Sequence, residues 1–190
     1  MPQKHFFLLF YLILCSFFSE AQTNLPFSPE NGDRIIFLGS GLIENEQQYG
    51  FLEYALTSYW ADKHLTFRNL GWSGDTVFGD ARSYYTNPPG PYDLLISQIK
   101  TTQPDWVIIG YGSVEAEKGA QGLPDFKKGL NQLLDSVKTT GAKVIMLSTI
   151  PQAAAGTNEL LIKRNADFLL YNAAIEALAD TRDLVYLDIF

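Results

Sequence analysis

Cysteine, histidine and positive charge are all scarce in this sequence of 190 residues. It contains one cysteine, Cys15, and two histidines, His5 and His64. A single cysteine excludes an intrachain disulfide, and so few thiol and imidazole groups disfavour a zinc or other transition-metal site. We therefore expect neither a bound metal nor a cofactor.

Acidic side chains outnumber basic ones by 21 to 14, which gives a formal net charge of −7 at pH 7. Such an excess of negative charge repels phosphate backbones and anionic lipid headgroups. Nucleic acid and anionic membrane surfaces are therefore unfavourable partners. The sequence also lacks internal repeats, charge blocks and low-complexity segments. A single folded domain is the expected organisation.

The N-terminal segment is typical of an export signal. Lys4 and His5 form a short basic start, and the residues from Phe6 to Phe18 are all apolar or small. At about 1.5 Å per residue, this run spans under ~20 Å as a helix, too short for a hydrocarbon core of about 30 Å. Small residues then precede Gln22 where a signal peptidase cleaves. We predict a signal peptide over 1–21, a linker over 22–32, a domain over 33–190, a secreted or periplasmic location and no stable membrane anchor after cleavage.

Short apolar runs alternate with longer amphipathic runs along the rest of the chain, a pattern typical of βαβ units and a mostly parallel sheet. The expected strands are Arg34–Leu38, Leu65–Leu70, Trp106–Gly110, Lys143–Ser148 and Leu184–Leu187. The expected helices are Glu46–Lys63, Tyr92–Thr102, one from Pro124 to a stop at Gly141, and Glu159–Ala179, with a long loop over Gly71–Pro91. The sequence therefore predicts a three-layer α/β/α domain around a five-stranded parallel sheet.

Ligands of an open parallel sheet bind outside the carboxyl ends of its strands. In this chain that edge would carry residues 39–41, 71–76, 111–115 and 148–152. A dinucleotide-binding loop needs a third small residue where Glu44 stands, and the Glu44 carboxylate would repel phosphate. Nucleotide binding is therefore disfavoured.

One of these segments, from Asn69 to Thr76 (NLGWSGDT), resembles the second sequence block of the SGNH (GDSL-type) hydrolases. The turn at Gly39, after the first expected strand, is similar to their first block, usually G-D-S. The segment from Pro104 to Glu115 resembles their third strand and third block, usually G-x-N-D. The three blocks occur in the family order, and the resemblance runs from residue 31 to 190. It implies a flavodoxin-like SGNH fold, with its last helix missing here, and an ester-hydrolase ancestry.

The resemblance implies a mechanism in which a serine attacks the ester, a histidine oriented by an aspartate activates it, and three donors hold the oxyanion. It assigns one of these donors, a backbone N–H, to Gly74. Gly41 stands at the nucleophile position, Ser40 at the preceding aspartate, and Val114 at the asparagine that donates to the oxyanion. The D-x-x-H block that follows the fifth strand in the family is absent from the sequence. We therefore expect a hydrolase domain truncated at its C-terminus.

Two interpretations of Ser40 remain open. It is either a displaced nucleophile or a turn serine that hydrogen-bonds local backbone groups, and we favour the second. A crossover helix should place His64 at the amino-terminal edge of the sheet, far from Ser40. We therefore predict that this histidine does not pair with Ser40.

The other pocket candidates also have two interpretations each. Asp75 and Glu115, near Arg82, can serve as an acid–base pair or as loop caps and solvated charges. Trp72 and Tyr111 can stack on a sugar ring or pack within the protein with a polar tip outward. Gly39 and Gly41 complete the predicted pocket.

The resemblance implies a hydrolase of acyl or acetyl esters, including those of carbohydrate. Because Gly41 and Val114 replace the serine and the asparagine, we expect this activity to be absent or impaired. The alternative is a secreted, non-catalytic domain that keeps the hydrolase pocket for binding. Both interpretations predict a small ester or an acylated carbohydrate as the partner.

Overall fold

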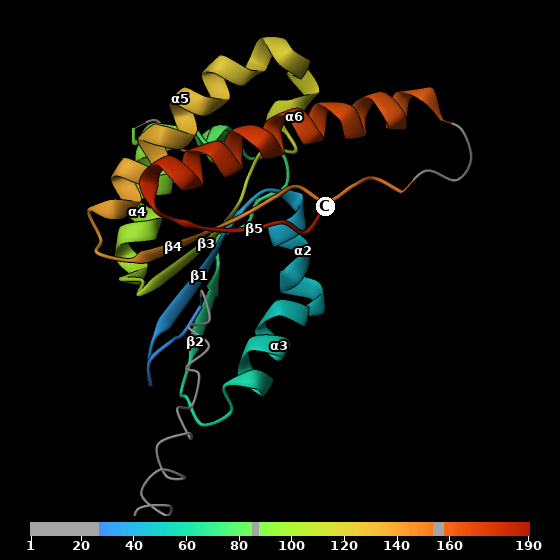
Figure 1. The fold of residues 1–190 in the computed structure, drawn as a ribbon. Coiled ribbons are helices and arrows are strands. Elements are labelled where there is room, and N and C mark those ends of the chain that lie inside the picture. The colour runs from blue at the N-terminus through green and yellow to red at the C-terminus, as the bar shows by residue number, and fades with distance from the viewer. Residues whose placement is uncertain (1–26, 85–87, 154–157) are drawn as a thin grey trace, which may run out of the picture.

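The computed structural model describes residues 27–84, 88–153 and 158–190 (Figure 1). Five parallel strands form a single sheet with the order β2-β1-β3-β4-β5, so the predicted α/β fold and five-stranded parallel sheet are confirmed. The predicted signal peptide lies outside the described residues. The strands are β1 (Arg34–Gly39), β2 (Thr66–Asn69), β3 (Trp106–Gly110), β4 (Lys143–Leu147) and β5 (Val185–Leu187).

Helices cover both faces of this sheet (Figure 1). One face carries α4 (Pro91–Thr102), α5 (Gly119–Lys138) and α6 (Glu159–Arg182), and the other carries α2 (Gly41–Tyr49) and α3 (Phe51–Tyr59). Short 3₁₀ helices, η2 (Asp80–Tyr84) and η3 (Glu115–Lys118), lie in two of the connections.

Alternate residues of the central strands supply the two hydrophobic cores. Ile36 and Leu38 of β1 belong to the core under α4, α5 and α6. Ile35 and Phe37 of the same strand belong to the core under α2 and α3. Because side chains alternate across a strand and both faces are covered, β1 is apolar along nearly its whole length. This explains why the sequence reveals the strands so clearly.

Two predicted helix boundaries are wrong. The helix expected over 46–63 is two helices, because the chain breaks at Gly50 with φ of 64°. It also begins earlier, at Gly41, directly after β1. The helix expected to start at Pro124 begins at Gly119, since η3 leads straight into it and Pro124 lies inside.

Part of the predicted linker packs onto the domain. Phe27 is 8% exposed, and its ring makes edge-to-face contacts with Trp60 and Trp106 at centroid distances of 4.8 and 4.7 Å. Phe27 therefore contributes to the core beneath α3.

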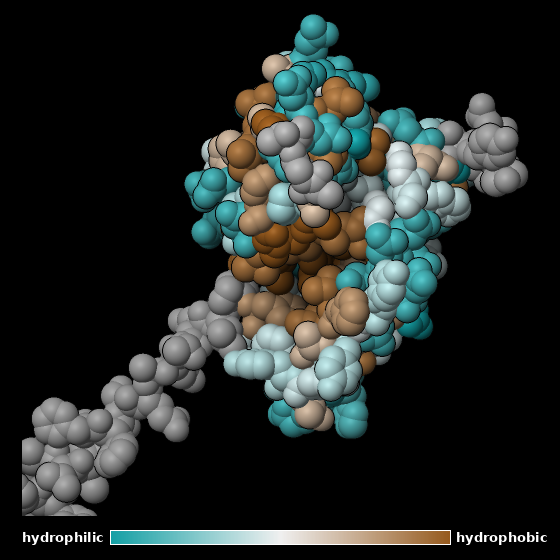
Figure 2. All heavy atoms as spheres, turned by 90° about the vertical axis from the view of Figure 1, so that its right-hand side faces the viewer, coloured by the Kyte–Doolittle hydropathy of each residue, from teal (hydrophilic) through white to brown (hydrophobic). Residues whose placement is uncertain are grey.

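Apolar residues gather in a hollow on the side of the molecule where the chain ends (Figure 2). Leu187, Ile189 and Phe190 near that end are 38, 41 and 38% exposed. Among the residues that the structure describes, no helix is both long and apolar enough to cross a membrane.

Candidate functional site

The strand order reverses between β1 and β3, and this switch point is where ligands of doubly wound sheets bind. Gly39 pairs with Gly110 at the carboxyl ends of the two strands. The hydroxyl oxygens of Ser40 and Ser113, which follow these strands, lie 3.0 Å apart. The backbone N–H of Trp72, from the loop after β2, donates to the Gly39 carbonyl at 3.0 Å. The predicted convergence of the three segments at one edge is therefore confirmed.

Ser40 itself is fully buried, with 0% of its surface exposed. Its hydroxyl shares a hydrogen bond with Ser113, and its carbonyl accepts from the Glu44 N–H at 3.0 Å as α2 begins. The hydroxyl of Ser40 does not cap α2, so its partner is another side chain rather than the local backbone that we expected. A hydroxyl without exposed surface does not meet a substrate, so the structure argues against Ser40 as a displaced nucleophile.

His64 lies at the opposite, amino-terminal edge of the sheet. Its backbone N–H donates to the Asn31 side chain at 2.9 Å, and it stands two residues before Thr66, which pairs with Arg34 at the start of β1. The six residue-to-residue steps from Arg34 to Ser40 span about 20 Å at ~3.3 Å per step. His64 is the only histidine among the described residues. This agrees with the prediction that it does not pair with Ser40.

Asp75, Arg82 and Tyr111 form a buried network rather than the mouth of a pocket. The Arg82 guanidinium donates to the Asp75 carboxylate at 2.9 Å, and the Tyr111 hydroxyl donates to the same oxygen at 2.8 Å. Asp75 is 0%, Tyr111 2% and Arg82 4% exposed. The prediction that Asp75 and Tyr111 line the pocket is corrected accordingly. The carboxylate is desolvated, and so it needs the nearby cation.

The network joins several elements of the fold. Arg82 also donates to the Leu70 carbonyl at the end of β2 and to the Gln98 side chain of α4, each at 2.6 Å. Burial, and after it the neighbouring Asp75 charge, raises the pKa of the Tyr111 phenol well above its ordinary value. Tyr111 therefore remains a hydrogen-bond donor at every physiological pH.

Glu115 is likewise a structural acceptor rather than a pocket acid. It is 7% exposed, and its two carboxylate oxygens accept from the backbone N–H groups of Val77 at 2.9 Å and Gly112 at 3.0 Å. Burial raises the pKa of Glu115 above its ordinary value, although these two hydrogen bonds act in the other direction.

The raised pKa of Glu115 predicts a pH dependence of stability. Because the folded state holds this proton more tightly than the unfolded chain, the contribution of Glu115 is fully present below its unfolded pKa, near 4.5. It is lost as pH rises through the higher folded pKa. We expect the free energy of unfolding of the native protein to fall relative to that of Glu115→Gln as pH rises from about 4.5 through the raised folded pKa. Urea unfolding of both proteins at several pH values measures this difference.

Asp135→Asn is the matched control for that titration. A hydrogen bond from Arg182 lowers the pKa of the exposed Asp135 carboxyl. Its contribution is therefore present above the unfolded pKa and is lost as pH falls. The difference in free energy of unfolding between each variant and the native protein should change with pH in opposite directions for the two variants. Equal pH slopes of this difference would contradict the assignment for Glu115.

The loop after β2 carries Trp72 and Gly74 at the surface. Asp75 N–H donates to the Trp72 carbonyl at 3.0 Å, which closes a four-residue turn. Gly74 occupies the third position with φ of 78°, the conformation that a type II turn requires there. Trp72 is 44% exposed, so of the two predicted aromatic platforms it alone reaches solvent.

Sequence reasoning missed a hydroxyl–carboxylate pair in this loop. The exposed Ser73 hydroxyl donates a hydrogen bond to the carboxylate of Glu44, in the first turn of α2. A Cβ atom built on Gly41 would lie 3.5 Å from the Ser73 oxygen. The pair therefore borders the position at which the resemblance places the nucleophile. The spacing of Glu44 and Ser73 in sequence gives no signal of this contact.

A cavity of about 190 Å³ opens beside Ser113 at the same edge of the sheet. Its lining combines hydroxyl and amide groups with apolar side chains and includes no charged residue. An apolar cavity of about 150 Å³ holds one benzene molecule, so this one suits a sugar ring or a short acyl group. It is lined by Leu42, Asn45, Gly110, Ser113, Ser148, Thr149, Ile150, Pro151, Gln152 and Phe168.

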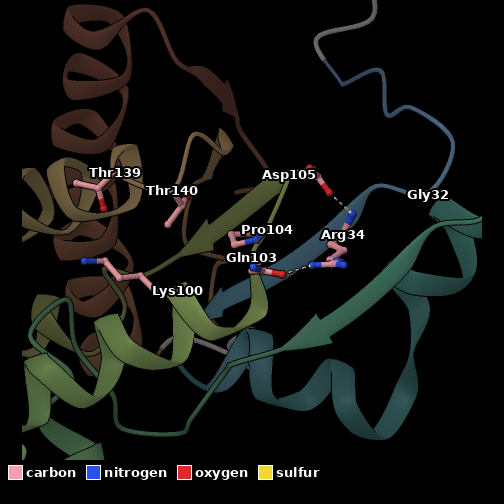
Figure 3. A pocket seen from close by; sticks show the side chains of 8 residues that line it. All are labelled: Gly32, Arg34, Lys100, Gln103, Pro104, Asp105, Thr139 and Thr140. Atoms are coloured by element: carbon pink, nitrogen blue, oxygen red, sulfur yellow. Dashed lines mark hydrogen bonds between the residues drawn. The ribbon is translucent and has the colours of Figure 1, made fainter.

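A larger, shallow depression of about 780 Å³ lies at the other edge of the sheet (Figure 3). Arg34, from the start of β1, donates to the Gln103 side chain at 2.9 Å, and its backbone N–H donates to Asp105 at 2.8 Å. This edge is opposite the switch point, away from residues 39–41, 71–76 and 111–115, which follow the strands. We therefore place the functional site at the carboxyl edge, despite the smaller cavity there. Within the described ranges, no three His, Cys, Asp or Glu side chains gather as metal ligands.

The fold is similar to that of solved SGNH/GDSL-type esterases. A catalytic mutant of Axe2, an acetylxylan esterase from Geobacillus stearothermophilus, matches with a TM-score of 0.66 and 16% identity, over 85% of this chain and 78% of that one. A GDSL-like lipase from Bacteroides thetaiotaomicron matches with a TM-score of 0.56 and 19% identity, over 82% and 68%. A gut microbial diltiazem-metabolizing enzyme matches with a TM-score of 0.59 and 15% identity, over 85% and 37%. No family model and no curated protein matches the chain.

Proposed function

We propose that this protein binds a small ester, with acylated carbohydrate as the favoured class, at the carboxyl edge of its sheet. We also propose that the serine–histidine hydrolysis of the SGNH esterases is lost or impaired in it. The observation that carries the proposal is the uncharged cavity beside Ser113 in an esterase-type fold whose nucleophile position is Gly41.

The chemistry of the cavity supports a neutral ligand. Ser113 and Gln152 offer hydroxyl and amide groups that match sugar hydroxyls, whereas Leu42 and Ile150 offer apolar surface for an acyl methyl group. A charged ligand would find no counter-ion among the lining residues. The similarity to an acetylxylan esterase favours an acetylated sugar over other esters.

Three observations support impaired hydrolysis. Gly41 has no side chain to attack an ester, and Val114, at the start of η3, has no hydrogen-bond donor on its side chain. His64 lies at the wrong edge of the sheet to act as a base there. Loss of one oxyanion donor alone typically costs about 10²–10³ in rate.

Export is part of the proposal. The apolar run from Phe6 to Phe18 precedes a candidate cleavage site. A secreted or periplasmic location also suits a domain that binds acylated polysaccharides. Fractionation of cells that express the full chain, with mass spectrometry of the mature N-terminus, tests this part.

Binding and hydrolysis of an acetylated xylo-oligosaccharide test the proposed function. We expect saturable binding by calorimetry, and acetate release at least about 10²-fold slower than that of Axe2 assayed in parallel. Ile150→Trp, which fills the cavity, should weaken binding at least tenfold. Ile162→Trp, at another exposed isoleucine, on α6 and outside the cavity, is the matched control. Acetate release at the rate of Axe2, or binding that Ile150→Trp leaves unchanged, would refute the proposal.

A further inference from the structure

We propose that Ser73 takes up the acyl group of a bound ester, with Glu44 as the base that accepts its proton. This inference rests on the proposed function, because the same bound ester supplies the acyl group. It gives the protein a slow acyl-transfer chemistry based on residues other than those of the SGNH mechanism.

The first support is the position of Ser73 relative to Gly41. The hydroxyl oxygen of Ser73 lies 3.5 Å from the point where a Cβ of residue 41 would stand. A nucleophile at position 41 would therefore begin in contact with the Ser73 hydroxyl. Ser73 is exposed, whereas Ser40 is completely buried. Of these two serines, only Ser73 is accessible to a molecule from solvent.

The second support is the hydrogen bond from the Ser73 hydroxyl to the Glu44 carboxylate. A carboxylate in direct contact with a hydroxyl is correctly placed to accept its proton during attack. None of the ion pairs between described residues involves Glu44. No lysine or arginine therefore competes with the Ser73 hydroxyl for this acceptor.

The third support is the rigidity of the loop that carries Ser73. The Asn69 side chain donates to the Ile43 carbonyl of α2 at 2.6 Å and accepts from the Gly71 N–H at 2.7 Å. The Trp72 N–H is fixed to β1 through the Gly39 carbonyl. These contacts attach the loop to the helix that carries Glu44. The serine and its base are thus held together before a substrate arrives.

The reaction balances with water as the only co-reactant. The Ser73 oxygen bonds to the acyl carbon while its proton passes to Glu44. The bond from that carbon to the alcohol oxygen then breaks, and the alcohol leaves with the proton. Water attacks the acyl-serine and gives one proton to Glu44, which returns it to the Ser73 oxygen as the carboxylic acid departs. The Gly74 N–H, next along the chain, is the oxyanion donor that the resemblance assigns.

The acyl-serine should accumulate, because the one histidine among the described residues, His64, lies at the opposite edge of the sheet, and Val114 stands where the resemblance expects a donor. Incubation of the purified protein with p-nitrophenyl acetate should therefore add one acetyl group, located on Ser73 by peptide mass spectrometry. Ser73→Ala should abolish this modification. Glu44→Gln, which keeps the shape but cannot accept the proton, should slow it by about 10²-fold.

Ser97→Ala is the matched control, since Ser97 is also an exposed serine but donates to the Leu94 carbonyl. This variant should be acetylated at the native rate. Ser73→Cys tests the position independently of the hydroxyl, and should form a thioester that hydroxylamine removes. Thermal unfolding of every variant shows whether it folds.

The outcomes separate this inference from the proposed function. Acetylation confined to lysines, or unchanged in Ser73→Ala, overturns the role of Ser73. Oligosaccharide binding without acetylation of Ser73 overturns the inference and leaves the binding proposal intact. Acetylation of Ser73 without oligosaccharide binding supports the inference and rejects carbohydrate as the ligand class.

Discussion

Replacing Arg82 by methionine is expected to lower the free energy of unfolding by about 3–5 kcal/mol. The guanidinium is the cation that compensates the Asp75 carboxylate, and the two side chains are 2% and 0% exposed. Methionine fills much of the volume but leaves a buried negative charge. The Tyr111 hydroxyl and the Ala81 N–H remain as donors to Asp75. Neutral donors recover only part of the loss, because a desolvated carboxylate requires a charge of opposite sign.

Urea unfolding of the purified protein measures this effect. Arg68→Met is the matched control, since Arg68 is exposed on β2 and, among the described residues, its side chain donates only to the carbonyl of Phe67 next to it. It should change the free energy by less than about 0.5 kcal/mol. In the double variant Asp75→Asn with Arg82→Met no buried charge is left unpaired, so it should lose less than the sum of the single variants. A loss below about 1 kcal/mol for Arg82→Met alone would contradict the structural role of the pair.

The Arg82→Met substitution should also affect the candidate site. Asp75 closes the turn that contains Ser73, and Arg82 ties the end of β2 to α4. Loss of the ion pair frees one end of this turn while the contacts to α2 persist. We therefore expect acetylation of Ser73 to slow in those Arg82→Met molecules that remain folded.

Replacing Gly71 by alanine should both destabilise the protein and separate Ser73 from Glu44. A Cβ atom on Gly71 would lie 2.4 Å from the backbone nitrogen of Glu44 and 2.7 Å from the carbonyl carbon of Ile43. Both obstacles are helix backbone, which does not rotate aside as a side chain does. The loop must move away from α2, at a cost typical of overpacking, about 1–3 kcal/mol. Denaturant unfolding and the rate of Ser73 acetylation measure the two effects.

Gly90→Ala is the control for the added methyl group. A Cβ atom on Gly90 meets only the Asp93 carboxylate at 3.6 Å, an ordinary contact, and its φ of −65° suits alanine. This variant should keep native stability within about 0.5 kcal/mol and native acetylation. If Gly71→Ala were as stable and as reactive as Gly90→Ala, the loop would not be held as the structure shows.

The sequence predicted the sheet well because its three central strands are buried on both faces. The strand Trp106–Gly110 has the predicted bounds, and β1 and β4 differ from prediction by one residue each. It predicted the helix boundaries less well. The break at Gly50 and the early start of α5 at Gly119 depend on how the chain leaves β1 and η3. Such connections are set by packing rather than by local periodicity.

The pocket interpretation of Asp75, Glu115 and Tyr111 is wrong for a related reason. Asp75, Glu115 and Tyr111 occur beside glycines in segments that follow strands, and nothing in their spacing distinguishes a pocket residue from a buried acceptor. Their burial results from the way in which the loop after β2 folds back over the end of β3. Only coordinates reveal that Arg82, seven residues away, lies beneath that loop as the partner of Asp75.

The sequence by itself determined the parallel α/β architecture and the edge of the sheet at which the three glycine-rich segments meet. It also showed that Gly41 and Val114 stand where the resemblance to the SGNH hydrolases expects a serine and an asparagine. The local sequence is sufficient for these properties, because strand periodicity and the absence of a functional group at a given position are visible without any tertiary contact. The tertiary structure alone decided that Ser40 is buried and that Ser73 meets Glu44. Such contacts join residues about 30–70 positions apart, and their existence depends on the packing of α2 against two strand ends.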